Sequence, residues 1–86
     1  MTDIEKDKFT SALVHRGWLL QKGTVWAPSK GIWFSDSHYR QWSLTDFATI
    51  FARRAIRIEE GKVGPTWEDA ARENRQVSEA AKEALK

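Results

Sequence analysis

Cysteine is absent from this chain of 86 residues, so neither a disulfide framework nor a thiolate metal site is open to it. No apolar run is long enough to span a bilayer, and we expect no membrane insertion. The first residues, Met1 to Asp7, are polar and rich in acids, where a secretory signal is basic and then apolar. These absences favour a cytoplasmic protein that folds without cross-links.

Histidine is nearly as scarce, with two in the chain, so few side chains are suited to acid–base catalysis. His15 falls near the end of an expected helix, where a cation complements the helix dipole. His38 lies among Asp36, Tyr39 and Arg40, but a lone histidine in a loop is more often a surface or packing residue than a catalyst. Asp36 and His38 offer two metal ligands with no third within reach, and no glycine-rich phosphate loop is present. We therefore expect no enzymatic activity, no cofactor and no metal.

Net charge is also modest, at +2, because 14 basic residues nearly balance 12 acidic ones. Its distribution is uneven, because seven basic and two acidic residues lie between positions 16 and 57, while both ends of the chain are net acidic. This bias is weaker than the dense basic stripe of a dedicated nucleic-acid-binding protein.

Tryptophan, by contrast, is abundant: the chain has five, and Trp18, Trp26 and Trp33 fall in one short stretch. Glycine- and proline-containing turns at 22–23 and 28–31 divide this stretch into three strands, 18–21, 24–27 and 32–35, which we expect to form an antiparallel meander. Pairing Leu19 with Trp26, and Trp26 with Trp33, places these three side chains on one face, the tryptophan ridge. The opposite face then carries Trp18, Leu20, Val25, Ala27, Ile32 and Phe34.

Helices are expected before and after the meander in the chain, with the first two packed on one face of the sheet. The first begins near Thr2, spaced with Glu5 as a capping box, and ends at Gly17, where Trp18 can pack back on the last turn. The polar segment 35–42 is expected to be a loop. A second helix begins after Ser43, which forms a capping box with Asp46, and runs to about residue 60 before Gly61 ends it.

A third helix, 66–86, follows a short hinge at 61–65 and is expected to be capped by Thr66 with Asp69. Its apolar face is narrow and rich in alanine, which buries little area per turn, so we expect it to fray after about Ala80. The sequence thus predicts a single α+β domain, 1–86. Its core, 1–60, is a helix, a three-stranded antiparallel meander and a second helix, to which the C-terminal helix is appended.

The core is expected where the second helix meets the sheet. The helix has an apolar stripe at three- and four-residue spacing that includes Phe47 and Phe51. We expect these two phenylalanines to be buried together with Leu20, Val25 and Phe34. Two further residues, Leu13 and Trp18, are expected at the edge of this cluster.

The second helix also carries the most asymmetric charge pattern in the chain. Arg53, Arg54 and Arg57 project away from its apolar stripe, with Ile50 among them. They form either an ordinary solvated face or a surface that contacts phosphates or the acidic groups of a partner. An exposed isoleucine among the arginines favours contact with protein.

The tryptophan ridge is the other candidate surface. Either the C-terminal helix folds back over it, with Trp67 joining it, or it stays open as a stacking platform for bases or as the centre of a subunit interface. Lys22, Lys30 and Arg40 flank the ridge and are compatible with phosphate contact.

The element order resembles that of the double-stranded-RNA-binding domain and of the HicA-type mRNA-interferase toxins. The succession of helix, glycine, tryptophan, strand and glycine turn from Phe9 to Ala27 is similar to the opening of those toxins, and the likeness covers about residues 9 to 58. The toxins place a histidine just after the first hairpin turn, where Val25 follows Gly23 and Thr24 here. The resemblance implies a nucleic-acid-related role without nuclease activity.

We therefore expect a non-enzymatic cytosolic binding module that contacts another protein or its own copy. Its binding residues are expected to be Leu19, Trp26, Trp33, Arg40, Ile50, Arg53, Arg54 and Arg57. The alternative is a weak RNA- or single-stranded-DNA-binding domain that uses Trp26 and Trp33 for stacking and the arginines for phosphate contact.

Overall fold

Four helices and a three-stranded antiparallel sheet make up the computed structural model, which describes all residues from 1 to 86. In chain order the elements are α1 (Asp3–His15), β1 (Leu19–Gln21), β2 (Thr24–Trp26), β3 (Trp33–Phe34), α2 (Asp36–Gln41), α3 (Leu44–Gly61) and α4 (Trp67–Ala84). The fold is α+β, with the predicted order of helix, meander, helix and C-terminal helix. None of these helices combines the length and the apolar character needed to cross a bilayer.

The sheet has the predicted topology and register. Its strands follow the order β1-β2-β3, and Leu19 pairs with Trp26 while Trp26 pairs with Trp33. The β1–β2 turn is tight because Lys22 and Gly23 both adopt positive φ angles, 51° and 78°, as a two-residue hairpin turn requires. The tryptophan ridge therefore exists as one face of the sheet.

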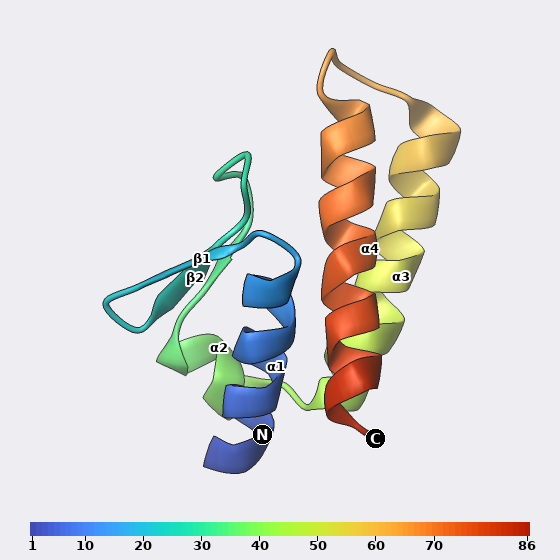
Figure 1. Cartoon of the computed structure of the whole chain (residues 1–86). Coiled ribbons are helices and arrows are strands. Elements are labelled where there is room, and N and C mark those ends of the chain that lie inside the picture. The colour runs from blue at the N-terminus through green and yellow to red at the C-terminus, as the bar shows by residue number, and fades with distance from the viewer.

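The helices form two groups around the sheet (Figure 1). Helices α3 and α4 run antiparallel beside each other, and α1 packs against α4 on one side and the sheet on the other. The short helix α2 links β3 to the start of α3. The β1–β2 hairpin projects away from the helices, so only part of the sheet is covered (Figure 1).

Phe34 lies at the centre of a single hydrophobic core to which α1, the sheet, α2, α3 and α4 all contribute. Its ring centroid lies 5.0 Å from that of Phe47 and 5.5 Å from that of Phe51. The predicted burial of these three residues and of Val25 is confirmed. Leu13 and Trp18, expected at the edge of the core, are fully buried.

Leu20 was wrongly placed in this core. Its pairing with Val25 does put it on the same sheet face, but its side chain is 52% exposed. The reason is that β1 is an edge strand, whereas Val25 lies on the central strand β2 and is fully buried.

Local capping explains most of the helix boundaries. The capping boxes of Thr2 with Glu5 and Ser43 with Asp46 are both present. Helix α1 ends as predicted, because Gly17 has a φ angle of 93° and the Trp18 N–H donates to the Leu13 carbonyl oxygen at 3.1 Å.

The predicted cap of the C-terminal helix is wrong. Thr66 makes no side-chain capping bond, and Asp69 instead accepts from Arg72 at 2.6 Å. The expected fraying is wrong as well, since α4 is regular to Ala84, and Ala80 and Ala81 are completely buried. Alanine buries little area, but it lets α4 approach α3 and α1 closely. The Ser78 hydroxyl even donates to the Ala48 carbonyl oxygen of α3, at 2.6 Å.

The segment 35–42 is likewise not the predicted loop, because residues 36–41 form α2. At its start the Ser35 N–H donates to Nδ1 of His38 at 3.0 Å. At its end the N-terminal ammonium of Met1 donates to the carbonyl oxygens of Tyr39 and Trp42, at 2.7 and 3.1 Å. The short helix is therefore held at both ends by polar contacts that no helical periodicity reveals.

Candidate binding groove between the sheet and α3

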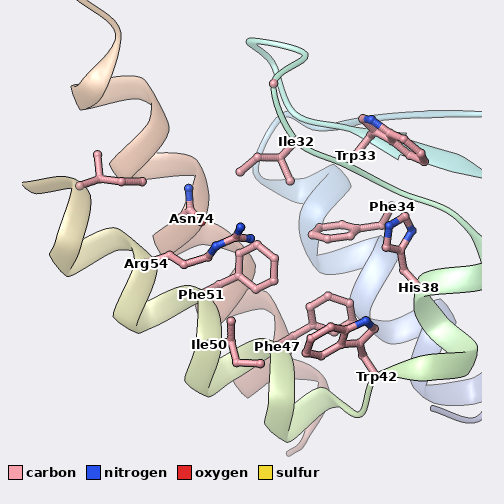
Figure 2. A pocket seen from close by; sticks show the side chains of 12 residues that line it. Ile32, Trp33, Phe34, His38, Trp42, Phe47, Ile50, Phe51, Arg54 and Asn74 are labelled. Atoms are coloured by element: carbon pink, nitrogen blue, oxygen red, sulfur yellow. The ribbon is translucent and has the colours of Figure 1, made fainter. Parts of the chain in front are cut away.

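A groove of about 680 Å³ separates strand β3 from helix α3 (Figure 2). Strand β3 and the turn before it form one wall, α3 forms the other, and α2 and its C-terminal end close one end. We call it the β3–α3 groove. Most of its lining is apolar: Ile32, Trp33, Phe34, Trp42, Phe47, Ile50, Phe51 and Ile58. The remaining lining residues are Gly31, His38, Arg54 and Asn74.

The floor of the groove is rigid because it is part of the core. Phe34 meets Phe51 edge to face, at an interplanar angle of 84°. Trp42 precedes the capping residue of α3 and packs on Phe47, with ring centroids 6.2 Å apart. This contact between the residue before the cap and the fourth helical residue is a hydrophobic staple, and it fixes the angle at which α3 leaves α2.

Arg54 is the only charged residue that lines the groove. Its guanidinium carbon lies 5.2 Å from the centroid of the Phe51 ring, in the geometry of a cation–π contact. It forms no ion pair, because the chain's four salt bridges involve Lys6, Arg16, Arg72 and Arg75. The side chain points into the groove in Figure 2. An aromatic wall and an unpaired cation thus lie side by side.

His38 is positioned by the backbone rather than poised for proton transfer. Because its Nδ1 accepts the hydrogen bond from the Ser35 N–H, we assign the ring proton to Nε2. The ring stands edge-on to Trp33, with centroids 5.3 Å apart and an interplanar angle of 89°. The histidine therefore supports the Trp33 indole at the mouth of the groove.

Trp33 belongs to both the groove and the tryptophan ridge. Its side chain is 46% exposed, and its ring lies 5.8 Å from that of Trp26 at an interplanar angle of 34°. The third member of the ridge, Leu19, is 55% exposed. The ridge is not covered by α4, since Trp33 and Leu19 stay exposed, and Trp67 packs beside Lys62 at the start of α4 instead of joining the ridge. The groove and the ridge form one continuous surface with Trp33 between them.

Only some of the predicted site residues come together in the structure. The structure brings Trp33, Ile50 and Arg54 together in the groove. Arg53 and Arg57 stay on the exposed face of α3 outside it, and Arg40 is exposed on α2. The sequence pattern grouped Arg54 with Arg53 and Arg57. The structure instead separates it from them by turning it toward Phe51.

Several groove residues escaped the sequence analysis. Trp42 and His38 were assigned to a loop, although the staple between Trp42 and Phe47 was visible as a spacing around the Ser43 cap. Ile58 was not predicted as a site residue either, although its spacing of four residues from Arg54 and eight from Ile50 places it on the same stripe of the helix.

Two buried polar groups lie outside the groove lining. The Glu73 carboxylate, on α4, accepts from the Ser29 N–H at 3.0 Å and from the Ser29 hydroxyl at 2.5 Å, which fastens the β2–β3 turn to the helix. The Tyr39 hydroxyl is buried without a hydrogen-bond partner. Burial, and secondarily the nearby charge of Asp36, raises the pKa of Tyr39, so the phenol remains neutral. No cluster of three or more potential metal-ligating side chains is formed.

Comparison with known proteins provides no relative from which to transfer a function. No protein-family model, characterised protein or solved structure matches the chain.

Proposed function

We propose that this protein is a non-enzymatic cytosolic binding module that recognises a segment of another protein through the β3–α3 groove. The observation that carries the proposal is the position of Arg54 against the apolar wall formed by Phe51 and Ile50. A groove of this composition suits a partner segment with an apolar side chain and an adjacent carboxylate. The side chain would fill the groove, and the carboxylate would pair with the free guanidinium.

A protein partner fits this geometry better than a nucleic acid. A nucleic acid requires several cations along a phosphate backbone, whereas the groove presents one, and Arg53 and Arg57 lie outside it. Successive bases also stack on similarly oriented aromatic faces, whereas Trp26 and Trp33 are tilted by 34° and His38 supports Trp33 from the side. The tilted pair instead offers exposed tryptophan surface, and aromatic residues are enriched in protein interfaces.

The arrangement gives no comparable support to an enzyme. Nδ1 of His38 is occupied by a backbone donor, and no carboxylate lines the groove to act with the ring. The other histidine, His15, is on the exposed end of α1.

A displayed library of random peptides tests the proposal directly. We expect selection on the immobilised chain to enrich peptides that combine an acidic residue with neighbouring apolar residues. Arg54→Glu should weaken a selected synthetic peptide about tenfold or more, since it replaces an attractive charge with a repulsive one. Trp33→Ala should weaken it comparably through lost apolar contact.

Matched controls separate the groove from the rest of the surface. Arg53→Glu makes the same charge change one residue earlier on α3, outside the groove, and should leave binding within about twofold at physiological salt because surface charges are screened there. Equal losses for Arg53→Glu and Arg54→Glu would show general electrostatic attraction and refute the groove. Enrichment of peptides whose binding ignores both Arg54 and Trp33 would refute it as well.

A further inference from the structure

The pairing within the sheet determines where the backbone N–H and C=O of Trp33 point. Residues opposite each other in an antiparallel pair alternate between pairs that exchange both backbone hydrogen bonds and pairs that exchange none. The Ala27 N–H donates to the Ile32 carbonyl oxygen at 2.9 Å, which makes Ala27 and Ile32 a hydrogen-bonded pair. The next pair, Trp26 with Trp33, is therefore a non-hydrogen-bonded one. The N–H and C=O of Trp33 must point away from β2, toward the free edge of the sheet.

The outward-pointing donors on either side of Trp33 are already used. The Ser35 N–H donates to Nδ1 of His38, and the Gly31 N–H donates to the Ser29 hydroxyl at 3.3 Å. Trp33 has no such partner. Along the free edge of β3, the outward-pointing N–H groups of Gly31 and Ser35 are thus bonded to side chains of this chain. Only the N–H and C=O of Trp33, which borders the groove, remain free to bond a partner.

We infer that the partner segment binds in extended conformation and adds to β3 as a fourth strand, exchanging both backbone hydrogen bonds with Trp33. This inference rests on the proposed function and specifies how the same site is used. Strand addition supplies affinity through the main chain and selectivity through alternate side chains. Because only one backbone pair is open, the added strand is short, about three residues.

The pleat of the sheet then determines which side chains of the segment face the groove. The residue opposite Trp33 projects on the ridge side, beside the two indoles, because opposing residues share a face. Its two neighbours project on the other face, which carries Phe34 and lies toward Phe51 and Arg54. We expect one of these neighbours to be apolar and the other to be aspartate or glutamate.

A partner protein satisfies these requirements and a second copy of this chain does not. Two copies paired through their β3 edges would present residues 31–35 to each other, and this segment contains no carboxylate for Arg54. A helix lying in the groove would leave the Trp33 N–H and C=O without protein partners. The extended acidic segment alone uses the backbone pair, the aromatic wall and the cation together.

Amide hydrogen exchange on the ¹⁵N-labelled chain, with and without a synthetic peptide from the library selection, tests the inference. We expect exchange of the Trp33 amide to slow at least about tenfold when the peptide is saturating. Leu20 is the matched control, because the same register points its N–H outward on the opposite edge, at β1. Its exchange should not change.

N-methylation of the peptide, one residue at a time, provides the second measurement. Methylation of the residue opposite Trp33 removes a donor and should weaken binding about tenfold, whereas methylation of its two neighbours should change it less than about threefold. If methylation at every position leaves binding unchanged, or if the sensitive positions recur every three to four residues, strand addition is overturned. Protection of Leu20 instead of Trp33 would overturn it too.

The outcomes distinguish the inference from the proposal on which it rests. Binding that depends on Arg54 but leaves the Trp33 amide unprotected keeps the groove and rejects strand addition. Absence of any Arg54-dependent peptide rejects both. Concentration-dependent protection of Trp33 without peptide, accompanied by dimerisation in sedimentation, would assign the edge to a second copy and overturn the inference.

Discussion

Truncation of Phe51 to alanine tests how the groove and the core share one residue. The Phe51 ring is 7% exposed, packs edge to face on Phe34, and lies 5.6 Å from Phe47. Loss of a buried phenylalanine costs about 3–5 kcal/mol, the sum of the lost transfer free energy and the cavity left behind. Because Phe51 lines an open groove, water can enter the space it leaves, and we place its cost near 3 kcal/mol.

Truncation of Phe47 is the comparison against which the cost at Phe51 is judged. Phe47 also lines the groove, but it is only 2% exposed and is enclosed by the rings of Phe9, Phe34, Trp42 and Phe51, so its removal opens a void with fewer ways to relax. We expect Phe47→Ala to cost about 4–5 kcal/mol, much of the total stability of a domain this small. Urea unfolding followed by circular dichroism measures both. An unchanged Phe51→Ala midpoint, or a cost exceeding that of Phe47→Ala, would show that the groove floor is misassigned.

Three other predictions concern the caps, the α4 interface and nucleic acid. Hydrogen bonds from the capping serine lower the pKa of Asp46 below its ordinary value of 3.8, so this cap stabilises the fold above that value and is lost as pH falls further. In the Asp46→Asn variant, the free energy of unfolding should therefore fall less steeply than in the parent as the pH is lowered into the acidic range. An equally steep fall in the variant would contradict this. Ala80→Leu should destabilise by about 1–3 kcal/mol through overpacking, read as a lower thermal midpoint. If the surface binds single-stranded RNA instead, a labelled strand should bind the parent at low salt and lose binding in the Arg53→Glu, Arg57→Glu double variant; no low-salt binding removes that alternative.

The parts of the fold that sequence predicted are those determined by neighbouring residues. The Gly17 helix end, the Ser43 capping box and the pairing of Trp26 with Trp33 all follow from local steric or hydrogen-bonding requirements. Leu20 and α4 were misjudged because their burial depends on distant elements. Alternation assigned Leu20 to the correct face, but its 52% exposure shows that the helices do not cover it there.

The candidate site was also predicted only in those parts that depend on neighbouring residues. Trp33 and Ile50 were identified from the ridge and from an apolar residue set among arginines, and both line the groove. Arg54 sits at the border between two helix stripes, and the Phe51 ring, not the sequence spacing, decides the side on which it lies. One end of the groove is formed by His38 of α2 and by Trp42 after it, and α2 was not expected.

The contact between Ser29 and Glu73 ties one wall of the groove to α4. Both carboxylate oxygens of Glu73 are occupied by donors of this one turn residue, and the acid is otherwise buried. A small displacement of the turn would lose both bonds together and leave a buried acid unsolvated, which is more costly than stretching either bond. The two bonds therefore hold the turn against α4, and they fix the position of the groove wall that the turn forms.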